Sequence, residues 1–204
     1  MDFEWLKNTQ KGKCVVMGCG PSVTTLQPYV DKCFKIGVND VGDFCDPDML
    51  VILDYKDVFA PKRYDTIIST RPKMLASQVP QWDKDIASPH HSFQLRLGSR
   101  KIENFDVDLA SGKVPISITS PYVGIVLAYY MGFDEIGLTG VDFTQNHYNN
   151  NDGIHKLNKR IEEVNTAYKN IYNKLKEHDV LLWNLSKESV IEIPKMDLKE
   201  FFSR

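Results

Sequence analysis

The chain has 204 residues, of which 42% are hydrophobic and 25% are charged, and its formal net charge is −2 at pH 7. This composition fits a globular protein of about one domain and excludes a mainly disordered or collagen-like chain. The small net charge gives no overall attraction to polyanions, so nucleic acid is not the expected partner.

Two features bear on location and redox state. No stretch reaches the ~20 apolar residues of a membrane span, and the first residues lack the apolar core of a signal peptide. We therefore expect a soluble, cytoplasmic chain. The spacings of the cysteines fit neither a zinc knuckle nor a disulfide framework, so we interpret them as buried free thiols. They are Cys14, Cys19, Cys33 and Cys45.

The first third of the chain predicts short strands separated by turns and helices. A β-rich run at Lys13 to Met17 enters a glycine-proline turn, and a helix is expected from Thr24 to Val30. Three more apolar runs follow and are interpreted as strands. They are Lys35 to Asn39, Met49 to Asp54 and Thr66 to Thr70.

The middle and the last third differ in clarity. Prolines interrupt residues 71–113, which we interpret as an irregular insertion. A buried helix is expected from Thr119 to Gly132, then a strand from Glu135 to Gly140. Residues 144–154 are polar and asparagine-rich, as in a lid. A long amphipathic helix carries Leu157 to Leu175, and a last strand precedes the tail.

Continuous apolar strand runs are typical of a parallel sheet that is covered on both faces. The sequence therefore predicts an α/β, Rossmann-like, mostly parallel sheet with helices on both faces. We expect residues 1–204 to form one domain, because no linker or repeat divides them. Ligands of such sheets bind at the carboxyl ends of the strands, where several polar residues stand here.

The glycine turn is the first candidate site. Gly18 and Gly20 allow close backbone approach to a phosphate, and Ser22 could cap the next helix, whose amides attract anions. The turn is neither a P-loop nor the standard dinucleotide fingerprint, and a purely structural turn is the alternative. Asn39, Asp40 and Asp54 end strands, where they would bind a nucleoside or a cation, or cap the following turns.

Two residues near the lid are candidates for catalysis. Asp142 stands between a strand and the lid, and His155 opens the long helix, where it could deprotonate an acceptor when the lid closes. The alternative for His155 is a solvated loop histidine. His147 and His155 are eight positions apart, which is no recognised metal-ligand spacing, and we expect no metal site.

Three segments resemble the bacterial sialyltransferase-like glycosyltransferases. They are CGPSV at Cys19 to Val23, IGVND at Ile36 to Asp40, and ITSPYVGIVLAYYMGFDEIGLTGVDFTQN at Ile118 to Asn146. The resemblance covers about the first fifty residues and Ile118 to about Leu185. It implies a Rossmann-like, metal-free transferase that uses a nucleotide-sugar donor, usually CMP-linked in that family, and moves the sugar to an acceptor hydroxyl.

The resemblance also implies roles for individual residues. Gly20 and Ser22 would face the donor phosphate, Asn39 and Asp54 the nucleoside, and Asp142 the sugar, while His155 would be the base. Thr119 and Ser120 would lie at the donor pocket. We add to the donor-binding set Gly18, Pro21, Asp40, Gly140 and Tyr148.

Two departures leave the donor sugar open. Thr144 stands where that family typically has a tyrosine that helps the phosphate leave, and Tyr148 would replace its hydroxyl. The lid is also shorter than is usual in that family. The acceptor and the oligomeric state stay open as well, a homo-oligomer included.

Two other functions remain as alternatives. The turn, the strand end at Asp142 and the late Asn184-Leu185-Ser186 are also similar to 6-hydroxymethylpterin diphosphokinase-like proteins. That likeness would imply ATP and magnesium, with Asp40, Asp54 and Asp142 as candidate metal ligands. A non-catalytic nucleotide-binding module is the second alternative.

Overall fold

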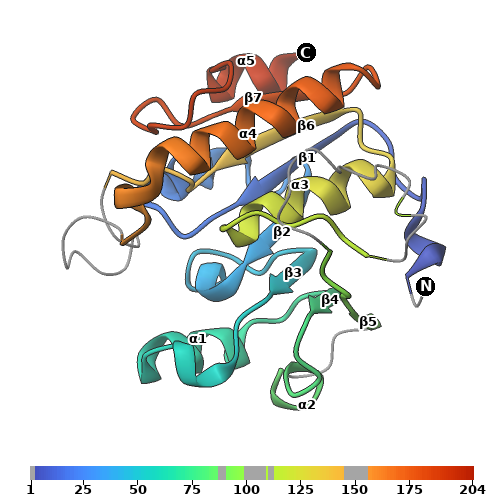
Figure 1. The fold of residues 1–204 in the computed structure, drawn as a ribbon, viewed down its shortest axis with the longest axis vertical. Helices are drawn as coiled ribbons and strands as arrows, with labels where there is room; N and C mark the ends of the chain where they lie inside the picture. The colour runs from blue at the N-terminus through green and yellow to red at the C-terminus, as the bar shows by residue number, and fades with distance from the viewer. Residues whose placement is uncertain (1–2, 87–90, 99–108, 110–112, 145–155) are drawn as a thin grey trace.

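A computed structural model describes residues 3–86, 91–98, 109, 113–144 and 156–204. Its centre is a seven-stranded, all-parallel sheet of order β5-β4-β3-β2-β1-β6-β7 (Figure 1). The strands are β1 Lys13–Met17, β2 Phe34–Val38, β3 Met49–Ile52, β4 Met74–Ser77, β5 His91–Gln94, β6 Glu135–Thr139 and β7 Leu181–Asn184. The predicted fold class is confirmed.

Helices and 3-10 turns connect the strands. The α-helices are α1 Pro61–Ser69, α2 Trp82–Asp85, α3 Ser120–Met131, α4 Ile161–Lys176 and α5 Leu198–Ser203. The 3-10 segments are η1 Glu4–Leu6, η2 Pro21–Tyr29, η3 Asn39–Asp43, η4 Lys56–Val58 and η6 Lys156–Arg160. Among the helices of the described residues, none combines the length and apolar character needed to span a bilayer.

Helices cover both faces of the sheet. In Figure 1, α3 and α4 lie on the side toward the viewer, and α3 packs on β1 and β2 at Val16 and Ile36. The opposite face carries η2 and α5, whose Tyr29 and Phe202 rings stack with centroids 4.7 Å apart. The residues of β1, β3 and β6 are almost all inaccessible to solvent, which explains their continuous apolar sequences.

The chain direction creates a switch point in the middle of the sheet. From β1 the chain adds β2, β3, β4 and β5 on one side, and then returns to place β6 and β7 on the other. The carboxyl ends of β1 and β6 therefore lie at the topological switch point of the sheet. An open parallel sheet binds its ligands beside such a point.

Two expectations about the elements are wrong. The run from Thr66 to Thr70 is the end of α1 and not a strand, because Pro61 starts a helix that places Tyr64 and Ile67 on one face. The predicted first helix is the 3-10 segment η2, in which Pro28 has no amide hydrogen for a regular α-helical bond.

The irregular insertion expected at residues 71–113 is also corrected for its described part. Strands β4 and β5 lie there and extend the parallel sheet through β3. Pro72 and Pro80 fall outside these strands, so neither removes a hydrogen bond from the sheet. Most of the predicted lid, from residue 145 to residue 154, lies outside the described residues.

The other predicted elements are confirmed. The long helix corresponds to η6 and α4, and the last strand to β7. Helix α3 ends where expected, because Gly132 at its C-terminus has φ of +98° and closes the helix in the left-handed conformation. Of the four free cysteines, Cys14 and Cys19 are buried, whereas Cys33 and Cys45 are only partly buried.

Candidate functional site

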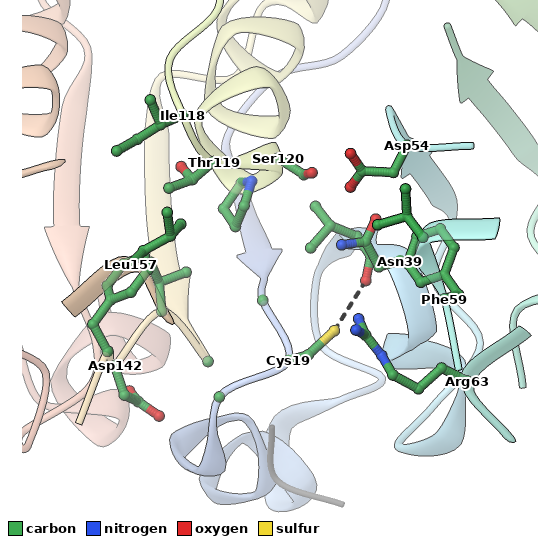
Figure 2. Close-up of a pocket in the computed structure, with 18 residues that line it drawn as sticks. Cys19, Asn39, Asp54, Phe59, Arg63, Ile118, Thr119, Ser120, Asp142 and Leu157 are labelled. Carbon is green, nitrogen blue, oxygen red and sulfur yellow. Dashed lines mark hydrogen bonds between the residues drawn. The ribbon is translucent and has the colours of Figure 1, made fainter. Parts of the chain in front are cut away.

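A cavity of about 220 Å³ lies at the carboxyl ends of β1, β2, β3 and β6, beside the switch point (Figure 2). Its wall is completed by the start of α3 and by Phe59 and Arg63 from the η4–α1 segment. Eight residues of the predicted site line this cavity: Gly18, Gly20, Asn39, Asp54, Thr119, Ser120, Gly140 and Asp142. The sequence motifs therefore converge on one place.

Three other predicted residues that the structure describes do not line this cavity. Pro21 and Ser22 border a neighbouring cavity of about 490 Å³, on which Asp142 also opens. Asp40 is fully buried behind the wall of the first cavity. His155 and Tyr148 lie outside the described residues, so their roles stay predictions.

The glycines of the two loops serve their mutual packing. The Gly20 amide donates to the Gly140 carbonyl at 2.6 Å, and the Gly18 amide donates to Thr139 at 2.8 Å. A methyl group on Gly18 would overlap the Gly140 carbonyl oxygen, and Gly140 has φ of +68°. Only glycine permits this approach, because it has no Cβ and tolerates positive φ. The turn thus has a structural role whether or not a phosphate binds there.

Ser22 and Asp142 form a clamp across the same two loops. The Asp142 carboxylate accepts hydrogen bonds from the Ser22 amide at 2.7 Å and from the Ser22 hydroxyl at 2.5 Å. The Gly140 amide donates to that hydroxyl at 2.9 Å. Ser22 makes no side-chain cap, and Gly20 occupies the N-cap position of η2. Figure 2 shows the Asp142 carboxylate turned away from the centre of the cavity.

Asn39 and Asp54 line the opposite wall. Asn39 has φ of +51° directly after β2, and its Oδ1 atom is buried without a hydrogen-bond partner among the described residues. Burial against the cavity wall raises the pKa of the Asp54 carboxyl, although the positive charge of Arg63 acts against this effect. An unsatisfied buried acceptor and a carboxyl at the same wall suit a ligand rich in hydroxyl or amino donors.

The start of α3 supplies the electropositive part of the cavity. Thr119 is the N-cap residue, as expected, but its hydroxyl makes no cap and instead pairs with the Tyr168 hydroxyl at 2.9 Å. Burial raises the pKa of Tyr168, which keeps this pair neutral. Ser120 follows and lines the cavity (Figure 2). The first amides of a helix attract an anion, so this end of the cavity suits a phosphate.

Arg63 is a site residue that the sequence analysis missed. Its Nη2 donates to Asp40 Oδ1 at 2.6 Å, and Asp40 has no exposed surface. Burial alone would lower the pKa of Arg63, but the bond and charge of Asp40 raise it, so the guanidinium is a fixed cation. Arg63 lies in α1, near its start, where the sequence analysis predicts no element and no motif. The sequence signal for this helix is Pro61, because proline is common in the first turn of a helix. A helix predicted from Pro61 would have included Arg63.

The acidic residues do not form a metal centre. No group of three or more histidine, cysteine or acidic residues lies together within the ranges that the structure describes. Asp40 pairs with Arg63, and Asp142 is held by Ser22. Two of the three carboxylates that the diphosphokinase alternative would use for magnesium, those of Asp40 and Asp142, are therefore engaged in separate protein contacts.

Comparisons with known proteins give similarity at the level of structure. No family model matches the sequence, and no curated protein matches it. The sialyltransferase CstII from Campylobacter jejuni, solved with the substrate analogue CMP-3FNeuAc, has a TM-score of 0.53 at 13% identity, over 90% of this chain and 85% of that chain. The α-2,3-sialyltransferase Cst-I from the same organism has a TM-score of 0.50 at 14% identity, over 87% and 77% of the two chains.

A third similar structure is larger. The MAf glycosyltransferase from Magnetospirillum magneticum AMB-1 has a TM-score of 0.57 at 12% identity, and the match covers 92% of this chain but 34% of that one. All three neighbours are glycosyltransferases by their descriptions, as the sequence motifs led us to expect. This chain therefore has the α/β fold of the sialyltransferases CstII and Cst-I and of the MAf glycosyltransferase.

Proposed function

We propose that this protein is a glycosyltransferase that binds a nucleotide-sugar donor in the cavity at the switch point. The observation that carries the proposal is the convergence of residues from three separate motifs on that single cavity. These motifs are the segments whose sequences resemble sialyltransferase-like enzymes. Two independent comparisons, one of motifs and one of folds, thus support the same class of enzyme.

The cavity offers a chemical environment for each part of such a donor. The first amides of α3 and the Ser120 hydroxyl would bind the phosphate, because backbone donors at a helix start stabilise negative charge. Asn39 and Asp54 would accept hydrogen bonds from donor hydroxyl or amino groups. The analogue bound to CstII makes a CMP-linked donor the first candidate for this chain, and other nucleotides remain to be compared in the same assay.

The proposed reaction is a direct displacement. The acceptor hydroxyl oxygen attacks the anomeric carbon of the donor sugar while the bond from that carbon to the phosphate oxygen breaks. The leaving nucleotide keeps the bonding electron pair, and the helix start stabilises its new charge. His155 would take the proton of the acceptor hydroxyl, in accordance with the motif resemblance. No metal enters this proposal.

The binding step is tested by calorimetry with CMP, UMP and UDP in the presence of EDTA. Asn39→Gly should weaken the binding of the preferred nucleotide by about tenfold, since each hydrogen bond to a buried acceptor contributes about 1–1.5 kcal/mol. Glycine is chosen because it accepts the positive φ of Asn39. Asn8→Gly is the matched control, because Asn8 has φ of +55° and lies at an exposed position away from the cavity.

The catalytic step is tested by transfer assays with a panel of acceptors. His155→Ala should abolish most sugar transfer and leave nucleotide affinity nearly unchanged. Full transfer activity in that variant would refute the assigned base. Magnesium-dependent ATP binding with release of AMP only when a pterin is present would instead support the diphosphokinase alternative. Tight nucleotide binding without turnover would support a binding module.

A further inference from the structure

Arg63 is a charged residue of the cavity that no motif predicted and that the proposed reaction does not use. Its side chain extends from α1 over the rim of the cavity, and Figure 2 shows the guanidinium directed toward Asn39 and Cys19. The side chain keeps 22% of its surface exposed, while the carboxylate that it contacts has none. A ligand in the cavity can therefore reach the cation but not its counter-ion.

The surroundings fix the orientation of this guanidinium. Asp40 accepts a hydrogen bond from Nη2 at 2.6 Å, and the Cys19 thiol donates to the same Asp40 oxygen at 3.5 Å. The guanidinium carbon also lies 5.1 Å from the centre of the Phe59 ring, within the range of a cation–π contact. Two restraints from different elements hold the group before any ligand arrives, which lowers the entropy cost of binding.

The guanidinium has more donors than its protein partners use. Arginine carries five N–H donors in a planar fork. Within the ranges that the structure describes, the guanidinium of Arg63 makes one hydrogen bond, the one to Asp40. The Nε atom of Arg63 is buried without a hydrogen-bond partner there. The Oδ1 of Asn39, on the same wall, also lacks a partner there. Unsatisfied polar groups of this kind in a cavity wall indicate that part of the binding energy is reserved for a ligand.

We propose that Arg63 recognises a second anionic group of the donor, distinct from the phosphate at the start of α3. This inference rests on the proposed function and specifies its donor class. The group is either the carboxylate of an acidic sugar or the second phosphate of a nucleoside diphosphate, since a guanidinium fork binds both. Asp40 is a positioning residue, because it acts by holding Arg63 in place.

The competing explanation is that the ion pair only stabilises the contact between η3 and α1. In that case its loss would lower the stability of the fold and would change the affinity for all ligands by the same factor. A recognition role instead affects the ratio of two affinities, namely that for a ligand with the second anionic group and that for the same nucleotide without it. The ratio is independent of the fraction of protein that is folded, so it separates the two explanations.

The experiment measures this ratio by calorimetry for two ligand pairs, UDP against UMP and CMP-3FNeuAc against CMP. The variants are Arg63→Lys, which keeps the charge but loses the fork, and the double variant Asp40→Asn with Arg63→Gln. The double variant removes both charges together, because Arg63→Gln alone would remove the ion-pair partner of a buried carboxylate and destabilise the fold. Lys62→Gln is the matched control, an exposed cation beside Arg63 in α1.

In the wild-type protein we expect one pair to show a preference of about 10- to 100-fold for the ligand that carries the second anionic group, the range of one charge-assisted contact. Both Arg63 variants should reduce that preference to less than about threefold, while Lys62→Gln retains it. The pair that responds identifies the group as a carboxylate or as a phosphate.

Three outcomes would overturn the inference, and they differ in what they say of the proposed function. An unchanged preference in both variants for both pairs refutes the role of Arg63 and leaves nucleotide binding intact. The absence of a preference in the wild-type protein does the same. If the wild-type protein binds none of the four ligands, both the inference and the proposed function fail.

Discussion

Asp142 offers a sharp test, because the motif resemblance and the geometry assign it different roles. The resemblance places it beside the donor sugar, whereas its carboxylate is 3% exposed and bonded to the amide and hydroxyl of Ser22. A hydrogen bond to a charged group contributes about 1.5–3 kcal/mol, so the loss of both in Asp142→Ala should cost about 3–6 kcal/mol of unfolding free energy. This is a large part of the stability of a small domain.

The assay is urea unfolding followed by circular dichroism, with Asp54→Ala as the matched control. Asp54 lines the same cavity, and no hydrogen bond holds its carboxylate among the described residues, so its replacement should change stability by less than about 0.5 kcal/mol. Asp142→Asn keeps an acceptor for the Ser22 amide and should lose about half as much as Asp142→Ala.

The opposite pattern would refute the clamp. If Asp142→Ala unfolds within about 1 kcal/mol of the wild-type protein but loses sugar transfer, the carboxylate acts on the substrate, and the bonds to Ser22 add little stability. If both stability and transfer fall in Asp142→Ala, transfer by the more stable Asp142→Asn decides between the roles. A clamp predicts that transfer recovers together with stability.

Three further predictions concern stability. Gly18→Ala should lower the free energy of unfolding by urea by more than about 3 kcal/mol, because its methyl group meets the Gly140 carbonyl. Gly12 has φ of +77° but open space around it, so Gly12→Ala should cost about 1–2 kcal/mol. Equal losses in the two variants would contradict this. The pKa of Asp54 is raised in the folded state, so folding favours the protonated carboxyl and the free energy of unfolding falls as pH rises. Asp54→Asn should therefore be more stable than the wild type at pH 7 and should match it below about pH 3. Asp48 has a lowered pKa, since its bonds to Lys73 and to the Lys35 amide outweigh burial, so Asp48→Asn should be less stable at pH 7, with a difference that shrinks below about pH 4. Stability curves parallel in pH would refute both of these assignments.

The sequence predicts the fold well where apolar runs are long or strongly patterned. Strands β1, β3 and β6 were located because their continuous apolar runs are almost completely buried in the sheet, and β2 and β7 because each contains a shorter apolar run. The strand predicted from Thr66 to Thr70 was wrong because its four β-branched residues fit a helix turn as well as a strand. Strand β4 was missed because Met74–Ser77 contains no β-branched residue, and tertiary pairing with β3 decides its conformation.

The candidate site shows the same division. Residues one or two positions after a strand, such as Asn39 and Asp54, reach the cavity because parallel strands end at one edge of the sheet. Ser22 lies five positions after β1, within η2, and its side chain is bonded to Asp142 instead of lining that cavity. Spacing along the chain predicts which loop a residue belongs to. The partner that binds its side chain depends on the tertiary fold.

The glycine turn and the strand end at Asp142 therefore serve mainly to hold two loops of the fold together. Gly18, Gly140, Ser22 and Asp142 join the loops after β1 and β6 through contacts that leave no room for other side chains. These contacts join the two loops whichever ligand the cavity binds, so they do not select a donor. Donor choice must then depend on residues outside these contacts, and Arg63, from a helix with no motif, is a cation among the residues that line the cavity.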